Sequence, residues 1–165
     1  SYMDKSLSYL EEVEALLKSK GADVVKRVQQ LQQELQERNR EVKSLKDKLQ
    51  SQGSAELFKG VTEIKSNMVF KYIQAEEGAD IRKLGDLFID KYANGVVLIS
   101  TLKNGRASVL LKTFKGNKEI TCSHILRESL SELDGKGGGK PDLAQGSVKG
   151  DQLQDFVTKV KAQLQ

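Results

Sequence analysis

Glycine and lysine gather in one short stretch of the chain, where binding chemistry is most to be expected. From Gly135 to Gly146 the sequence reads GKGGGKPDLAQG and includes the only proline. Glycine costs a helix about 1 kcal/mol per position and proline about 3 kcal/mol, so the run predicts an irregular loop. Bare backbone N–H groups beside Lys136 and Lys140 favour contact with phosphate or another anion. A flexible surface loop without a ligand is the alternative interpretation.

The residue types present give little support for metal binding or catalysis. The chain has one histidine and one cysteine, which cannot supply the four ligands of a structural zinc site. His124 and Cys122 lack partners for nucleophilic catalysis, and neither a G-x-S-x-G elbow nor a P-loop is present. We therefore expect no catalytic site, metal or cofactor in this chain. The lone cysteine also favours a reducing, cytoplasmic setting.

The overall composition is that of a polar, mildly basic protein. The 165 residues are 38% hydrophobic and 30% charged, with a formal net charge of +4. Such a composition is typical of a long solvated helix joined to a modest core, and the charge permits a nucleic-acid partner without requiring one. No apolar run is long enough to cross a membrane, so no membrane partner is expected.

The spacing of apolar residues predicts two helices in residues 1–52. This region contains a single glycine, Gly21, which is expected to separate them. The short break favours a long antiparallel helical hairpin, a coiled-coil arm whose narrow apolar stripe needs a partner. The functional interpretation is a dimerisation or spacer arm, and the alternative is a hairpin without a partner. The stripe on the second helix follows a heptad pattern: Val24, Val28, Leu31, Leu35, Val42, Leu45 and Leu49.

Residues 53–165 are expected to form a separate globular domain, after a linker at Ser51–Ser54. Asn104-Gly105 is typical of a type I′ hairpin turn between two strands. The predicted order is strand, helix, strand, strand, helix, loop and helix, which indicates an α+β or α/β fold with a small mixed β-sheet and flanking helices. The elements are expected at 67–73, 81–92, 96–102, 106–114, 124–133 and, after the loop, from 151 onward.

The glycine run also resembles a known motif. Gly137–Gln145, GGGKPDLAQ, is similar to the signature loop of DHHA1-type domains, in the form found at the C-terminus of alanyl-tRNA synthetases. A helical hairpin before the domain, the segment ADIRKL at 79–84 and the segment GVVL at 95–98 agree with that family. Two residues depart from its pattern, because Asp134 and Ser147 stand where a further glycine is common.

The resemblance implies a tRNA-binding and dimerisation module. Such a domain would dock on the elbow of the tRNA, with tRNA(Ala) implied by the parent enzyme, and would assist aminoacylation and editing without chemistry of its own. The parent would be an alanine–tRNA ligase that uses ATP, Mg and Zn elsewhere in its chain. The other domains of that ligase would be further partners of this module. The residues expected to contact tRNA are Lys136, Gly137, Gly138, Gly139, Lys140, Gln145, Arg127 and Lys112.

Two other functions remain open at this point. DHHA1 domains also form the substrate-binding half of DHH-family phosphoesterases and exonucleases, which need a separate metal-binding domain rich in Asp and His. A purely structural module, whose task is the coiled-coil arm, is the other alternative.

Overall fold

The computed structural model describes all 165 residues, Ser1–Gln165, and they divide into two compact units, Ser1–Leu49 and Gln50–Gln165. The first unit contains helix α1 (Tyr2–Leu17) and most of helix α2 (Asp23–Leu57). The linker predicted at Ser51–Ser54 is wrong, because α2 continues through it without a break. Tertiary packing explains the difference: Phe58, just after the helix, is buried and makes an edge-on contact with Phe88, with ring centroids 5.3 Å apart.

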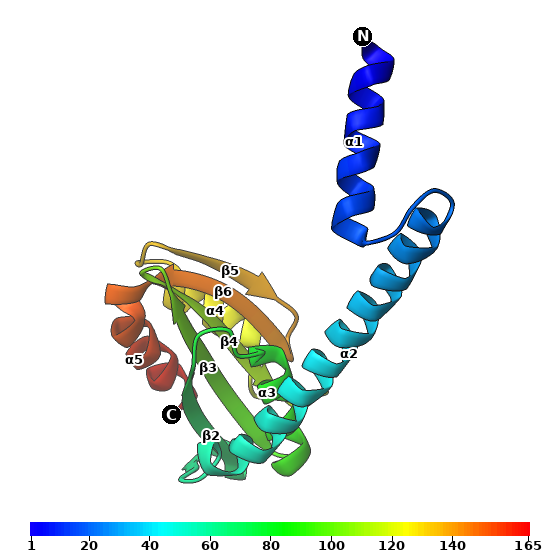
Figure 1. The fold of residues 1–165 in the computed structure, drawn as a ribbon. Coiled ribbons are helices and arrows are strands. Elements are labelled where there is room, and N and C mark those ends of the chain that lie inside the picture. The colour runs from blue at the N-terminus through cyan, green and yellow to red at the C-terminus, as the bar shows by residue number, and fades with distance from the viewer. The chain divides into compact units, whose positions relative to one another are not determined.

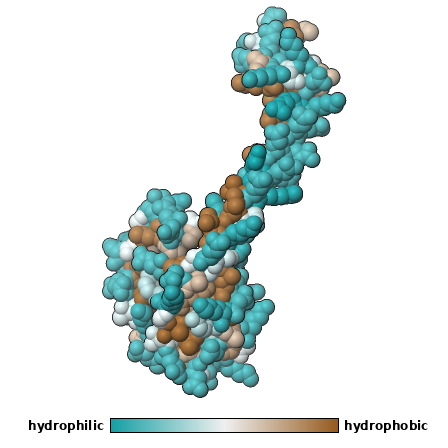
Figure 2. Space-filling model, turned by 60° about the horizontal axis from the view of Figure 1, so that its bottom comes forward, coloured by the Kyte–Doolittle hydropathy of each residue, from teal (hydrophilic) through white to brown (hydrophobic).

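The two predicted helices of the first unit and the break between them are confirmed. Helix α1 ends at Leu17 and is capped by Lys18, and Gly21 lies in the short connection with a φ of 57°. The apolar stripe of α2 is not buried against α1, however. Leu35 is 62% exposed and Leu45 is 59% exposed, and hydrophobic side chains stand out along the helices in Figure 2. The helical pair therefore leaves most of its apolar surface uncovered.

The second unit contains the predicted small mixed sheet, with more strands than expected. Its six strands follow the order β1-β2-β3-β4-β6-β5, in which β2 and β3 are parallel and all other neighbours are antiparallel (Figure 1). The strands are β1 (Thr62–Ile64), β2 (Met68–Ala75), β3 (Gly95–Lys103), β4 (Arg106–Thr113), β5 (Gly135–Gly139) and β6 (Leu143–Lys149).

Strand β3 is the centre of the sheet, as its unbroken apolar sequence predicts. Val96 and Val97 point to opposite faces, and both are fully buried. The turn that leads into β4 has positive φ at both central residues, 50° at Asn104 and 75° at Gly105. This is the requirement of the predicted type I′ turn.

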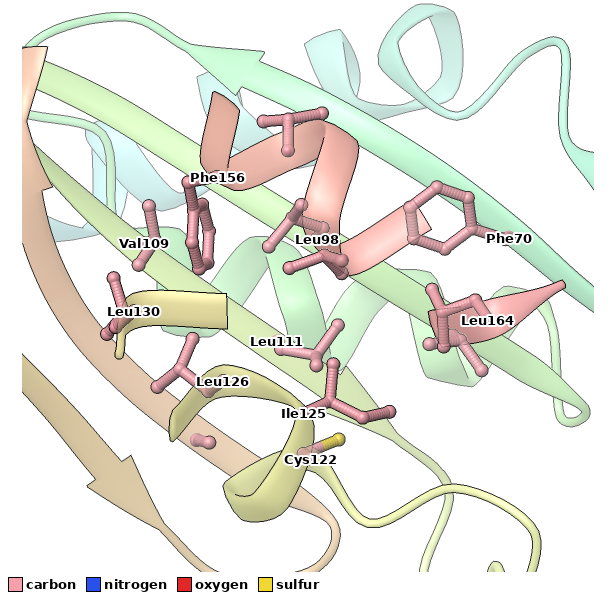
Figure 3. Packing of buried hydrophobic residues seen from close by; sticks show 14 of the residues in the cluster. Phe70, Leu98, Val109, Leu111, Cys122, Ile125, Leu126, Leu130, Phe156 and Leu164 are labelled. Carbon is pink, nitrogen blue, oxygen red and sulfur yellow. The ribbon is translucent and has the colours of Figure 1, made fainter. Parts of the chain in front are cut away.

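Helices cover the two faces of the sheet unequally. Helices α4 (Cys122–Leu130) and α5 (Leu153–Leu164) pack on one face, where they bury the larger core shown in Figure 3. Helix α3 (Ile81–Lys91) packs on the other face, mainly over β3 and β4. The second face therefore lacks a helix over β6 and β5.

The helix boundaries differ from the sequence predictions by a few residues. Helix α4 begins at Cys122 and ends at Leu130, although residues 124–133 were expected. A single 3₁₀ turn, Gly150–Gln152, precedes α5, although the helix was expected to start at Asp151. Both helices nevertheless bury the apolar residues that predicted them.

Candidate functional site

The glycine run is a β-hairpin, so the prediction of an irregular loop is wrong. Strands β5 and β6 pair antiparallel, with Gly138 opposite Gln145 and Lys136 opposite Ser147. The turn between them is closed by Lys140 and Leu143, whose backbones exchange hydrogen bonds of 2.8 and 3.3 Å. Glycine weakens a strand through its conformational entropy, and here the pairing with β6 and the packing of α4 outweigh that loss.

Three glycines of β5 have a structural reason. A Cβ atom at Gly135 would lie 2.7 Å from Leu130 Cδ2, and one at Gly137 would lie 2.8 Å from Leu126 Cδ2. Leu126 and Leu130 are buried residues of α4. At Gly139 a Cβ would lie 2.7 Å from the Ala144 backbone. These glycines allow α4 and the neighbouring strand to approach closely.

Gly138 has no such reason. No atom lies within 4 Å of the Cβ position at Gly138, and its φ is not in the positive region that favours glycine. By strand alternation its Cβ direction is opposite to that of Gly137, toward the face that α4 does not cover. Neither packing nor backbone conformation requires glycine there, whereas a ligand that approaches the backbone closely would require it.

The uncovered face around Gly138 is polar and basic. Lys136, Gln145 and Lys149 point to this side by strand alternation and are exposed. Ser147 accepts a hydrogen bond of 3.2 Å from Arg106 Nη2 of the neighbouring strand β4. We define this surface, Arg106, Lys136, Gly138, Gln145, Ser147 and Lys149, as the glycine face.

The edge of β5 adds backbone donors to this surface. Strand β5 ends the sheet, so one side of its backbone has no partner strand. Because Lys140 and Leu143 form a hydrogen-bonded pair, the antiparallel alternation turns the N–H groups of Gly137 and Gly139 away from β6. Both glycines are exposed. The hairpin therefore offers backbone N–H groups beside its lysines.

The positive charges of the site are not equivalent. Lys149 Nζ lies 2.7 Å from Asp134 Oδ2, and this hydrogen bond and the lysine charge hold the pKa of Asp134 below its ordinary value. The same contact raises the pKa of Lys149. Lys136 and Lys140 are exposed and form no ion pair with the protein. The net positive charge of the hairpin therefore resides mainly on Lys136 and Lys140.

Two expected site residues lie apart from the glycine face. The Lys112 side chain is only 16% exposed and pairs with Asp86 of α3 at 2.7 Å. Arg127 is exposed on α4, which covers the opposite face of the hairpin. The structure thus groups Lys136, Gly138 and Gln145, with Lys140 at the turn. Arg106 and Ser147 were missed, because no strand was expected at residues 143–149, and only that strand places Ser147 beside Arg106.

No metal centre or reactive thiol accompanies this surface. Within residues 1–165, no three His, Cys, Asp or Glu side chains are arranged to hold a metal ion. Cys122 is buried, and burial raises the pKa of its thiol to about 12. None of the helices combines the length and apolar character needed to cross a membrane.

The fold and the hairpin place the protein in a known class. The family model of the DHHA1 domain matches residues 65–165, and the chain belongs to that family. Among its relatives are alanine–tRNA ligases of Alkaliphilus metalliredigens, 29% identical over 99% of this chain, and of Alkaliphilus oremlandii, 28% identical over 97%. The chain spans 19% of the length of each of these two relatives.

Solved structures give the same picture of the fold. The C-Ala domain of alanyl-tRNA synthetase from Aquifex aeolicus is 26% identical, with a TM-score of 0.57 over 64% of this chain and 97% of that domain. RecJ from Thermus thermophilus, in complex with Mg²⁺, is 17% identical, with a TM-score of 0.55 over 86% of this chain and 21% of RecJ. The likeness to RecJ is a likeness of fold alone.

Proposed function

We propose that this chain is the tRNA-binding C-terminal module of an alanine–tRNA ligase, and that it contacts tRNA through the glycine face and the adjacent edge of β5. Its relatives and the C-Ala domain support this parentage. The observation that carries the site is Gly138: it is a glycine that the fold does not need, on an uncovered face beside unpaired lysines.

The chemistry of this surface suits an RNA backbone. Lys136 and Lys140 are four residues apart along an extended hairpin, about 13 Å at 3.3 Å per residue, so they reach different phosphates. The backbone N–H groups of Gly137 and Gly139 are further donors for phosphate oxygens or ribose hydroxyls. Gly138 leaves a flat area between the cations. Such a surface recognises shape and backbone charge, which is how proteins bind structured RNA.

The tRNA elbow is the part of the molecule that fits best. It is formed by two loops whose stacked bases are partly exposed, and a flat strip without side chains can lie against it. The same contact would serve every alanine-accepting tRNA, while identity would be read elsewhere in the parent ligase. Aminoacylation, editing and the ATP, Mg and Zn that they use belong to that longer protein.

The test is the affinity of the chain for tRNA(Ala) transcript as a function of salt. The double variant Lys136→Glu/Lys140→Glu is expected to weaken binding at least tenfold and to reduce the salt slope by about 1–2, because each lysine on a phosphate contributes slightly less than one. Lys43→Glu/Lys46→Glu is the matched control, since it makes the same charge change on exposed residues of α2. Equal losses in both double variants would assign the binding to net charge and contradict the site.

Footprinting of the same complex tests the elbow. Protection from hydroxyl radicals is expected at the elbow loops, and Lys136→Glu/Lys140→Glu is expected to remove it. Protection confined to the acceptor stem or the anticodon would contradict elbow docking while leaving RNA binding intact.

A homodimer through α2 is a second part of the proposal. The stripe residues Leu35, Leu45 and Leu49 are 62%, 59% and 69% exposed, and a heptad stripe of this kind is stable only when a second helix covers it. Light scattering is expected to show a dimer that Leu35→Lys/Leu45→Lys converts to monomer, while Gln36→Lys/Lys46→Gln on the same helix leaves it unchanged. A wild-type monomer at every concentration tested would reject the dimer.

A further inference from the structure

A row of three hydroxyl side chains crosses the sheet next to the cations of the glycine face. In this hydroxyl row, Ser108 of β4 is paired with Thr101 of β3 on one side and with Ser147 of β6 on the other. Lys136 of β5 continues the row, because it is paired with Ser147. Paired residues of antiparallel strands have Cβ atoms about 5 Å apart and point to the same face. Four polar side chains therefore lie in a line across four neighbouring strands.

The hydroxyl row lies on the side of the sheet opposite to α4 and α5. Val109, which follows Ser108, is buried in the core beneath those helices, so the side chain of Ser108 points the other way. The same alternation holds at Ser147, which is followed by the buried Val148. Ser108 is exposed, and Ser147 and Thr101 are half-buried. A ligand that lies on the glycine face can therefore reach the two serines.

The two serines have hydrogen-bonding capacity that the protein does not use. The hydroxyl of Ser108 makes no hydrogen bond to another residue. Ser147 Oγ accepts a hydrogen bond of 3.2 Å from Arg106 Nη2, and its own proton remains available for donation. A serine hydroxyl can donate one hydrogen bond and accept two, whereas lysine and arginine only donate. The serines therefore suit a ligand group that is itself both a donor and an acceptor.

A row of cations runs beside the hydroxyl row. Arg106 precedes Ser108 by two residues on β4, a distance of about 7 Å along a strand. Arg106 is paired with Lys103 of β3 on one side and with Lys149 of β6 on the other. Lys149 is occupied by Asp134, but Lys103 and Arg106 form no ion pair. The sheet thus presents groups for phosphate and, one side-chain row away, groups that can both donate and accept.

We infer that Ser108 and Ser147 bind ribose 2′-hydroxyl groups, so that the glycine face distinguishes RNA from DNA. The inference rests on the proposed tRNA contact and adds the part of the nucleotide that these residues recognise. A 2′-hydroxyl is both a donor and an acceptor, and it is the group by which a protein tells RNA from DNA at a given site. Arg106 and Lys136 would hold phosphates next to the bound sugars, and the short serine side chains let the ribose approach the sheet.

Two forms of the tRNA(Ala) transcript test the inference. One is unmodified, and the other has 2′-deoxynucleotides in both elbow loops, so both have the same number of phosphates. We expect the chain to bind the deoxy form at least fivefold more weakly and with the same salt slope, because no phosphate contact is lost. A transcript with 2′-deoxynucleotides only in the anticodon loop is the matched RNA control, and its affinity is expected to equal that of the unmodified form.

Variants of the chain assign the contact to the serines. Ser108→Ala/Ser147→Ala is expected to bind the unmodified transcript at least fivefold more weakly and to bind both forms with equal affinity. Ser108→Thr/Ser147→Thr keeps the hydroxyls and is expected to retain the preference for the unmodified form. Ser8→Ala/Ser44→Ala is the control, because it removes two exposed hydroxyls from α1 and α2, and it is expected to behave as the wild type. Thermal unfolding checks that each variant is folded.

The outcomes separate this inference from the proposed function. Equal binding of the two transcripts by the wild-type chain would overturn the ribose contact, and so would a preference that Ser108→Ala/Ser147→Ala retains. Both results leave the proposed function standing, because that function is tested by the salt slope and by Lys136→Glu/Lys140→Glu. A wild-type chain that binds neither transcript would reject the proposed function and the ribose contact together.

Discussion

Gly137 and Gly138 are neighbours in sequence, yet the structure predicts opposite effects for the same substitution. Gly137→Ala places a methyl group 2.8 Å from both Leu126 Cδ2 and Gln145 O and 2.9 Å from Gly146 Cα. Two of these three atoms belong to the backbone of β6, which cannot move without disturbing the hairpin. Gly138→Ala places its methyl group where no atom lies within 4 Å.

The magnitudes follow from these contacts. Overpacking of this kind destabilises a protein by about 1–3 kcal/mol, so Gly137→Ala is expected to lose that amount. Gly138→Ala is expected to be neutral or to stabilise by about 0.5 kcal/mol, because alanine reduces the conformational entropy of the unfolded chain at a position with an allowed φ. For a domain of about 100 residues, 1 kcal/mol corresponds to roughly 4–8 °C in Tm.

Thermal and urea unfolding of the two single variants, followed by circular dichroism, measure this difference. Gly138→Ala is expected to unfold at or slightly above the wild-type temperature, whereas Gly137→Ala is expected to unfold several degrees lower. If tRNA contacts the glycine face, Gly138→Ala is also expected to bind tRNA more weakly. Equal destabilisation of both variants would refute the division into structural and ligand-facing glycines. A stable Gly138→Ala variant with unchanged tRNA affinity would refute the close approach of RNA to this residue.

Three other predictions concern charges and the thiol. Asp134→Asn is expected to raise tRNA affinity and to increase the salt slope by about one, because it releases Lys149 from its ion pair; filter binding at several salt concentrations measures both. Lys112→Met is expected to leave tRNA affinity unchanged, because the side chain is paired with Asp86 beneath α3, and the same assay tests it. Cys122 is expected to resist Ellman's reagent in the folded chain and to react in urea. Since its pKa rises from 9.0 to about 12 on folding, the contribution of the thiol to stability is expected to be constant below pH 9. It is expected to decrease as the pH rises from 9 toward 12, because the unfolded chain loses the proton first; urea titrations at pH 8 and pH 10 measure the change.

The elements that the sequence predicts well are those whose own residues contain the signal. Strand β3 is an unbroken apolar run, and Asn104-Gly105 has the residues that a type I′ turn requires. Helix α3 shows a clear apolar period. Strand β5 contains no such signal, because a run of glycines has no side chains to alternate. What makes it a strand is the surface of its neighbours, Leu126 and Leu130 on α4 and the whole of β6.

The candidate site was predictable to the same extent. The residue types of an anion site, glycines beside Lys136 and Lys140, are visible in the sequence. Their grouping is not, because it depends on the strand assignment: only in a strand do Lys136 and Gly138 share a face with Gln145 of the partner strand. Arg127 and Lys112 were also expected at the site. Arg127 lies on α4, which covers the opposite face of the sheet, whereas Lys112 shares the sheet face of Arg106 but pairs with Asp86 of α3.

The same packing that makes the glycine run a strand also prepares it for binding. On one side of β5, Gly135 and Gly137 pack closely against α4 and leave no room for a side chain. The other side and the edge of β5 have no helix or partner strand over them, and Gly138 and the outward N–H groups lie there. A surface that is ordered before the ligand arrives loses little conformational entropy on binding. A flexible loop of the same composition would lose much more. In the proposed tRNA contact, the glycines therefore serve both faces of the strand: one set fits the helix beneath it, and Gly138 leaves room for the RNA.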